Sequence, residues 1–172
     1  MAMKSFQSNE LLSTVALIST PGKGILAADE STGTMGKRFV DINTENNFEN
    51  RRKYRQLLFT TEGIENCISG IILYEETVYQ STDKNASFMS ILKEKNIVPI
   101  IKLDKGLKIL PGGINDETIT IGLDDLDNRC REFYAKGCRA AKWRAVFKID
   151  ENNIDASPST LAMDENAHTL AR

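Results

Sequence analysis

IVPIIKLDKG, residues 97–106, is the stretch from which the expected fold follows. Its apolar part, residues 97–103, is nearly continuous rather than alternating, which is typical of a strand covered on both faces of a parallel sheet. Lys102 and Asp104 stand two residues apart at its end, and therefore on one face if the strand continues through them. The stretch predicts a buried strand that carries charged groups at its carboxyl end.

Three other segments have strand character, and helical patterns separate them. We expect strands at residues 24–29, 68–74 and 139–149, the first two as continuously apolar as residues 97–103. Helices are expected at residues 46–60, 87–95, 123–136 and from about Pro158 onward. Strands that alternate with helices pair in parallel through right-handed crossovers. The sequence therefore predicts an α/β fold, either a small open sheet or part of a closed barrel, which needs about eight strands.

Composition excludes several classes of protein. The chain has 172 residues, with 22 Lys plus Arg against 24 Asp plus Glu, and a formal net charge of −2. This near-neutral balance, without basic tracts, argues against a partner that is nucleic acid or a membrane surface. The apolar runs are far shorter than the roughly 20 residues that span a bilayer. These properties indicate a soluble globular domain.

The amino-terminal segment predicts a packing helix rather than a targeting sequence. Its apolar residues follow helical spacing, and its apolar stretch is interrupted by polar residues, unlike a secretory signal. The residues with this spacing are Leu11, Leu12, Val15, Ala16 and Ile18. The segment therefore favours a cytoplasmic protein.

Cysteine and histidine usage limits the chemistry. Cys67, Cys130 and Cys138 form no CxxC pair and cannot all be joined in disulfides, which favours a reducing compartment with buried thiols. The single histidine, His168, argues against Ser-His-Asp, Cys-His and multi-histidine metal sites. Any chemistry must therefore use carboxylates and amines.

Charged residues lie within or directly after each expected strand, and parallel α/β proteins bind their ligands at the carboxyl ends of their strands. They are Asp29 and Glu30, Glu75 and Glu76, Lys102 and Asp104, and Lys142 and Arg144, the last pair again expected on one face of its strand. One interpretation is a satisfied ion-pair network. The other is a functional cleft, which we favour because four strands deliver such groups to one end. Its cations suit an anionic substrate such as a phosphate, and Lys102 or Lys142, beside another cation, could form an imine.

Two neighbouring segments carry weaker signals. STGTMGK, residues 31–37, lacks the GxxxxGK[ST] spacing of a nucleotide-binding P-loop. We expect a turn there that presents backbone N–H groups and Arg38 to a phosphate. Arg51, within the sequence ENRRKYR, belongs by default to a solvated helix face.

Several of these segments together strongly resemble the class I fructose-bisphosphate aldolase family. The segments are GILAADESTGTMGKR, TENNFENRRKYRQLL, IIKLDKG, TITIGLDDLDNRC and AKWRAVFKI. The match runs from the first helix to Arg172, and the order and spacing of ADEST-G, KxDKG and AKWR form a specific combination. The resemblance implies the first half, about four βα units, of a TIM-type (β/α)8 barrel.

The resemblance also implies an activity. Family members are lyases of glycolysis and gluconeogenesis that cleave fructose 1,6-bisphosphate to dihydroxyacetone phosphate and glyceraldehyde 3-phosphate. They use a lysine Schiff base, no metal and no cofactor, and they assemble as homotetramers. By similarity, Asp29 acts on a substrate hydroxyl, and Lys142 assists proton transfer beside the Schiff-base nitrogen.

The substrate-binding residues implied by the resemblance are Lys102, Arg144, Arg38, Ser31, Thr34 and Arg51. Lys102 and Arg144 hold the sugar diphosphate, and Arg38 contacts one phosphate. For Arg51 this role competes with the solvated helix face. We expect Asp104 and Glu30 to support the set.

The length of the chain departs from the family, whose members are about twice as long because a complete barrel takes around 250 residues. We expect one truncated barrel domain over residues 1–172, with the imine lysine in the half beyond Arg172. The chain alone is then expected to be inactive. The alternatives are a short non-catalytic protein that binds a phosphosugar or pairs with an aldolase, and a free-standing phosphosugar-binding domain.

Overall fold

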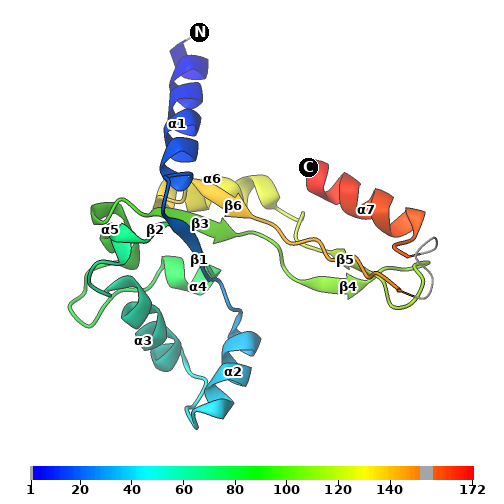
Figure 1. Ribbon diagram of the computed structural model, residues 1–172, viewed down its shortest axis with the longest axis horizontal. Helices are drawn as coiled ribbons and strands as arrows, with labels where there is room; N and C mark the ends of the chain where they lie inside the picture. The colour runs from blue at the N-terminus through cyan, green and yellow to red at the C-terminus, as the bar shows by residue number, and fades with distance from the viewer. Residues whose placement is uncertain (1, 152–156) are drawn as a thin grey trace. The chain divides into compact units, whose positions relative to one another are not determined.

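Alternating strands and helices make up the computed structural model, which describes residues 2–151 and 157–172 and confirms the α/β fold (Figure 1). The chain divides into two compact units. Unit 1 comprises Met1–Lys102 and Arg131–Ala141, and unit 2 comprises Leu103–Cys130 and Lys142–Arg172. The expectation of one barrel domain over the whole chain stays a prediction.

A four-stranded sheet has the order β1-β2-β3-β6. Its strands are β1 (Gly24–Ala28), β2 (Ile68–Leu73), β3 (Val98–Lys102) and β6 (Ala140–Lys142). β2 pairs in parallel with β1 and with β3. The first three strands lie where the sequence predicts them. The fourth is much shorter than residues 139–149, because its neighbour β3 ends at Lys102 and the strand pairing ends with it.

Helices occupy the segments between the strands. They are α1 (Ala2–Ile18), α2 (Thr32–Asp41), α3 (Phe48–Phe59), the 3-10 helix η1 (Ile64–Asn66), α4 (Glu75–Val78), α5 (Phe88–Glu94), α6 (Leu126–Lys136) and α7 (Thr160–Ala171). The helices expected at residues 46–60, 87–95, 123–136 and after Pro158 are confirmed. The turn expected at residues 31–37 is wrong, since most of this segment lies in α2.

Local side-chain caps explain where several helices begin. Ser31, Asn47, Ser87 and Ser159 each precede a helix, and each side chain accepts a hydrogen bond from the backbone N–H three residues later. Such caps satisfy a donor that the helix leaves unpaired. In α2 the cap is reinforced by burial of Met35 and Phe39, one turn apart on the same helix face, and this is why two glycines do not prevent a helix.

One face of the sheet forms the core of unit 1. The register places Ala28 beside Leu73 and Leu73 beside Ile101, and all three are buried. Phe59 of α3 and Phe88 of α5 pack edge to face, with ring centroids 5.2 Å apart and both rings fully buried. α5 contacts both α3 and β3. The core therefore joins this sheet face to two successive helices.

The other face of the sheet is open at β1. A Cβ added to Gly70 would lie 3.0 Å from Ile100 Cδ1 and 3.6 Å from Ile25 Cγ1, so these residues share that face. Ile25 is 49% exposed, whereas Ile100 is buried. The prediction that both faces of the first strand are covered is therefore wrong. An apolar run indicates a tendency to be buried, and β1, at the edge of the sheet, pairs only with β2 among the described strands.

α1 forms as predicted, but several of the apolar side chains expected to pack are exposed. Leu11, Leu12 and Val15 are all more than half exposed. Polar contacts fix the helix instead: Tyr134 Oη donates to Glu10 Oε2 at 2.6 Å, and Arg139 Nε donates to Glu10 Oε1 at 2.7 Å. Helical spacing places residues on one face without showing what covers that face. No helix in the described parts of the chain is long and apolar enough to cross a membrane.

The cysteines are only partly as expected. All three are free thiols, but Cys67 and Cys130 are exposed and only Cys138 is buried. Burial raises the pKa of the Cys138 thiol to about 11, so it remains protonated at neutral pH. The prediction of buried thiols is therefore wrong at two of the three positions.

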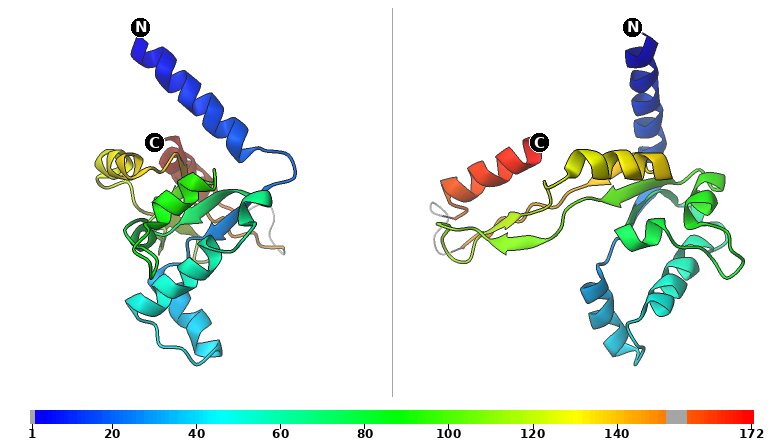
Figure 2. Two further views of the ribbon diagram at one scale, coloured as in Figure 1. Left: turned by 90° about the vertical axis from the view of Figure 1, so that its left-hand side faces the viewer. Right: turned by 180° about the vertical axis from the view of Figure 1, so that it is seen from behind.

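Unit 2 contains a hairpin that the sequence interpretation missed. β4 (Leu107–Ile109) pairs in antiparallel fashion with β5 (Thr118–Thr120), and Leu107 lies opposite Thr120. α7 runs alongside the hairpin (Figure 2) and contacts β5, where Asn166 Nδ2 donates to the Thr118 carbonyl oxygen at 3.1 Å. The available signal was Asn115-Asp116, both with positive φ, in a glycine-rich turn.

A buried carboxylate joins the hairpin to the start of α7. Glu117 accepts hydrogen bonds from the Ser159 backbone N–H and hydroxyl, each at 2.6 Å, and from the Ile114 N–H at 3.0 Å. These donors lower the pKa of the Glu117 carboxyl, those of Ser159 contributing most. Ser159 is also the N-cap of α7. The Glu117 carboxylate therefore connects the hairpin to α7.

Removing the buried ring of Phe59 will destabilise unit 1. Phe59→Ala leaves a cavity against Phe88, and we expect the free energy of unfolding to fall by roughly 3–5 kcal/mol in urea denaturation. Leu57→Ala is the matched control, because this side chain lies on the same helix but is mostly exposed. Equal losses in the two variants would contradict the assignment of Phe59 to the core.

Unit 2 is expected to lose stability in acid through Glu117. A folded-state pKa below the ordinary value of 4.5 means that this carboxylate stabilises the fold above that value. The contribution is lost as the pH falls through the lower, folded-state pKa. Thermal unfolding from neutral pH to about pH 3 should show this loss in the wild type and much less of it in Glu117→Gln. Asp124→Asn, a change at an exposed residue, should keep the wild-type profile; an unchanged profile in Glu117→Gln would contradict the interpretation.

Candidate functional site

Asp29 and Lys102 lie at the carboxyl ends of β1 and β3, and therefore at the same end of the sheet. Ala28 is level with Leu73, and Leu73 with Ile101, so the next residues, Asp29 and Lys102, share a level. Alternation places them on the face opposite to the core. β2 separates the two strands, which puts their backbones about 10 Å apart. Asp29 is buried and Lys102 half-buried, so unit 1 holds a carboxylate and an amine at the same end of its sheet.

The hydroxyls of Ser31 and Thr34 lie together at the start of α2. Ser31 Oγ is 3.1 Å from Thr34 Oγ1 and accepts the Thr34 N–H at 3.4 Å. The first residues of a helix favour a negative charge, because their N–H groups lack partners in the helix and its dipole is positive there. The structure therefore places both predicted hydroxyls at an end of α2 that can receive an anion.

Glu30 connects two arginines beside this helix. Its carboxylate pairs with Arg38 of α2 and with Arg55 of α3, and Arg55 Nη2 also donates to the Glu30 carbonyl oxygen at 3.0 Å. The Arg55 side chain is 3% exposed, whereas that of Arg38 is 55% exposed. Arg55 thus positions Glu30 from within, and Arg38 keeps a guanidinium edge available to a ligand.

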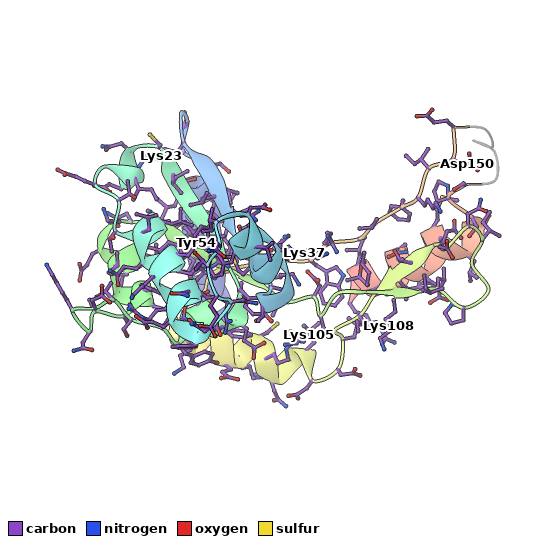
Figure 3. All side chains as sticks on the ribbon, turned by 90° about the horizontal axis from the view of Figure 1, so that it is seen from below. Lys23, Lys37, Tyr54, Lys105, Lys108 and Asp150 are labelled. Carbon is purple, nitrogen blue, oxygen red and sulfur yellow. The ribbon has the colours of Figure 1, made fainter. Side chains whose placement is uncertain are left out.

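Tyr54 adds a second contact between α2 and α3 (Figure 3). Arg38 Nη1 donates to Tyr54 Oη at 3.4 Å, and the Tyr54 ring packs against Phe39 with centroids 6.3 Å apart. Sequence reasoning did not single out Arg55 or Tyr54. A signal was available for Arg55, since it lies four residues after Arg51 and therefore on the same face of the helix.

Arg51 does not belong to a solvated helix face. Its Nε and Nη2 donate to the two oxygens of Glu76 at 2.8 and 2.7 Å, and Nη1 donates to Asn46 Oδ1 at 3.0 Å. Its side chain is 12% exposed, and the Glu76 carboxylate raises the pKa of the Arg51 guanidinium. Glu76 lies in α4, directly after β2. The default interpretation is therefore wrong, because α3 turns this arginine toward the carboxyl end of β2.

Unit 2 holds the other candidate residues, Asp104, Lys142 and Arg144. Both β3 and β6 end before the second residue of each predicted pair, so neither Lys102 with Asp104 nor Lys142 with Arg144 shares a strand face as expected. Asp104 is buried, and its Oδ1 accepts the Gly106 N–H at 3.1 Å. Lys142 is half-buried and accepts the Leu103 N–H at its carbonyl oxygen, at 3.0 Å. Arg144 is exposed, and its carbonyl oxygen accepts the Thr120 hydroxyl at 2.5 Å.

Arg129 and Gly122 fix the segment that carries Asp104. Arg129 donates to the carbonyl oxygens of Gly122, at 2.8 Å, and Leu103, at 2.5 Å. Gly122 has φ +129°, and an added Cβ would lie 2.9 Å from the Lys105 backbone nitrogen, so no larger residue fits without a shift. Lys105 and Lys108, labelled in Figure 3, are exposed. In this segment the Asp104 carboxylate is therefore buried, whereas Lys105 and Lys108 are exposed to solvent.

The candidate residues divide between the two units. Unit 1 holds Asp29, Glu30, Ser31, Thr34, Arg38, Arg51 and Lys102, and unit 2 holds Asp104, Lys142 and Arg144. In the described residues, no cluster of three or more His, Cys, Asp or Glu side chains could hold a metal ion. Unit 1 therefore offers a buried carboxylate, an amine, a helix start and two arginines, a set that can bind a phosphorylated ligand and move a proton.

Comparison with known proteins gives a consistent result. The family model described as "Glycolytic: Fructose-bisphosphate aldolase class-I" matches residues 10–172. Cytosolic fructose-bisphosphate aldolase 4 of Arabidopsis thaliana is 57% identical over 163 residues, which are 95% of this chain and 40% of that protein. Fructose-bisphosphate aldolase of Schistosoma mansoni is 53% identical over 167 residues, covering 96% of this chain and 45% of the relative.

A solved structure agrees with these sequence matches. It is a ternary complex of fructose-bisphosphate aldolase from Plasmodium falciparum with TRAP and a small-molecule inhibitor, with a TM-score of 0.89 and 47% identity over 95% of this chain and 46% of that one. This structural likeness confirms that the sheet is part of a TIM-type barrel, as the resemblance implied, and not an independent open sheet. The chain spans less than half the length of these relatives.

The Glu30 carboxylate should matter most for the buried Arg55. Glu30→Gln leaves the Arg55 guanidinium without its ion pair, and we expect a loss of roughly 3–5 kcal/mol in the free energy of unfolding, measured in urea. Glu49→Gln is the matched control, because Glu49 pairs with Arg52 but is half exposed; solvent screens that pair, so stability should change little. A Glu30→Gln variant as stable as Glu49→Gln would contradict this role.

Proposed function

The chain belongs to the class I fructose-bisphosphate aldolase family, and from this premise we propose that it forms part of a lyase that cleaves fructose 1,6-bisphosphate to dihydroxyacetone phosphate and glyceraldehyde 3-phosphate. The observation that carries the proposal is the match of the family model over residues 10–172. That matched region contains a carboxylate, amines and guanidinium groups at the carboxyl ends of the strands, as this chemistry requires.

Cleavage of a carbon–carbon bond needs an acceptor for the electron pair of that bond. A protonated imine between the substrate carbonyl and a lysine amine accepts the pair and becomes an enamine, so no metal or cofactor takes part in the proposed reaction. The hydroxyl on the leaving side loses its proton and becomes the aldehyde of glyceraldehyde 3-phosphate. Asp29 is the proposed acceptor of that proton, and its position directly after β1 supports this role.

The amines of this chain are assigned supporting roles. The imine lysine is proposed to lie in the part of the family sequence that follows the matched residues. Lys142 assists proton transfer at the Schiff-base nitrogen, and Lys102, with Arg144, holds the sugar diphosphate. The half-buried state of both lysines supports these roles, because partial desolvation strengthens contacts with phosphate.

Arg38, Ser31 and Thr34 are proposed to bind one phosphate. The N–H groups at the start of α2 and the exposed edge of Arg38 can act on the same anion, because Arg38 reaches from the last turn of α2 to Glu30, the residue before the Ser31 cap. Arg51 is proposed to contact substrate from its anchored position on Glu76. Glu30 and Asp104 have positioning roles, the first through Arg38 and the second within its own segment.

The setting of the whole protein follows from the same premise. The relatives named as cytosolic support a cytoplasmic location for this chain. We propose a homotetramer for the complete aldolase, with a sugar phosphate as its small-molecule partner and neither nucleic acid nor membrane among its partners. A short non-catalytic protein that binds a phosphosugar or pairs with an aldolase is the second candidate.

Borohydride trapping tests whether any lysine of this chain forms the imine. The 172-residue chain is incubated with fructose 1,6-bisphosphate and borohydride, which reduces any imine to a stable secondary amine, and intact mass with peptide mapping then locates the adduct. We expect no adduct, but measurable binding of the sugar bisphosphate by titration calorimetry. Arg38→Met should weaken this binding roughly tenfold, because a charge-assisted contact is lost.

The controls separate the outcomes. A full-length family member must give an adduct under the same conditions, and Lys84→Gln, at an exposed loop residue, should bind as the wild type does. An adduct on Lys102 or Lys142 would show that the imine amine is wrongly assigned. Absence of binding to a folded chain would contradict the proposed substrate site, whereas binding without catalysis in the complete protein would favour the non-catalytic candidate.

A further inference from the structure

Unit 1 contains a cavity of about 630 Å³ at the amino-terminal end of β3, the end opposite to Asp29 and Lys102. Its walls come from α1, α5, the first residues of β3 and the segment that ends α6. All the lining residues belong to unit 1, so the cavity is complete within that unit. Its volume falls within the range of about 300–1,000 Å³ that is usual for small-molecule sites.

The floor of the cavity is apolar. α1 and α5 contribute side chains that face the start of β3, where buried aliphatic residues lie. The apolar lining residues are Leu17, Met89, Ile97, Val98, Pro99 and Ala135. A ligand that fills this space must therefore carry an apolar body.

The charged groups that line the cavity are all cationic among the described residues: Lys93, Lys136 and Arg139. Arg139 is already balanced, because its Nε donates to Glu10 at 2.7 Å. Hydrogen bonds from Tyr134 and then Arg139 lower the pKa of the Glu10 carboxyl, which keeps that group ionised. Two lysines therefore decide the net charge of the cavity.

Lys93 and Lys136 stand in the last turns of α5 and α6, and both residues are exposed. One pair of cations beside an apolar floor suits a ligand with a single anionic group and an apolar body. A sugar bisphosphate has two phosphates and no apolar body, so it does not match this lining.

We propose that this cavity binds a small amphipathic monoanion, a carboxylate attached to an apolar body. The apolar body lies on the β3 floor, and the carboxylate lies between the Lys93 and Lys136 ammonium groups. The Lys136 ammonium nitrogen lies 5.2 Å from the centre of the Tyr79 ring, which is outside the cavity lining, so a bound carboxylate would share this cation with the ring. This site is independent of the aldolase proposal, because it uses none of the residues assigned to sugar phosphate.

Methionine methyl resonances give a direct test, because Met89 lines the cavity and Met35 is fully buried elsewhere in the same unit. Octanoate is titrated into the 172-residue chain labelled at its methionine methyl groups. We expect the Met89 signal to shift to saturation while the Met35 signal stays in place. Octanol, the uncharged analogue, should bind roughly tenfold more weakly, and 2-naphthoate tests whether an aromatic body is accepted in place of an aliphatic one.

Charge variants identify the carboxylate contact. Lys93→Gln and Lys136→Gln should each weaken octanoate binding by about fivefold, and Lys84→Gln, outside the cavity, should leave it unchanged. Fructose 1,6-bisphosphate should not displace octanoate, whether or not the chain binds that sugar.

Four results would overturn the proposal. They are an unshifted Met89 signal in a chain whose Met35 signal shows a folded unit, equal and unsaturated shifts of both signals, displacement of octanoate by the bisphosphate, and random-coil signals from both methyl groups. The first excludes the cavity as a site, the second indicates non-specific adsorption, the third places the anion at the sugar phosphate site, and the fourth shows that unit 1 does not form this cavity.

Discussion

The parallel register of β1, β2 and β3 is the constraint on which unit 1 depends. It aligns Ala28, Leu73 and Ile101 on the face that packs against the helices. Because side chains alternate along a strand, the same register places Asp29 and Lys102 on the opposite face at the carboxyl end. A slip of one residue would bury these charged groups in the core and expose the aliphatic ones, at a large cost in desolvation. Core and candidate site are therefore two consequences of one pairing.

Ion pairs then set how the cations of unit 1 can act. Arg51 donates to Glu76 through Nε and Nη2 and to Asn46 through Nη1, so a phosphate that reaches it must share the guanidinium with groups already in place. Arg38 shares Glu30 with the buried Arg55, but its exposed edge remains open. Pre-arranged guanidinium groups lose less side-chain entropy on binding than free ones, at the expense of competition from their carboxylate partners. In this unit the exposed Arg38 is thus better suited to first contact, and Arg51 to fixed orientation.

Sequence patterns predicted the strands that lie inside the sheet better than what surrounds them. Residues 68–74 and 97–103 form β2 and β3, because continuous burial leaves an apolar run. The predicted strand length was wrong at residues 139–149, because pairing there depends on a neighbouring strand that ends at Lys102. The predicted turn at residues 31–37 was wrong, because the Ser31 cap and two buried side chains stabilise a helix despite two glycines. For the site, charge at strand ends identified Asp29 and Lys102. The pairing of Arg51 with Glu76 was not predictable, since it joins α3 to the start of α4 across 25 residues.

The exposed face of β1 links the fold to the length of the chain. Ile25 belongs to an apolar strand and yet is half exposed on the face opposite to the core. In a closed barrel of about eight strands, that face is interior and is filled by side chains from other strands. The same closure would remove the free edges of β1 and β6, the two outer strands of the sheet. The pattern of apolar residues in β1 therefore suits a whole barrel better than the four strands described here, which is the relation expected from relatives more than twice as long as the matched region.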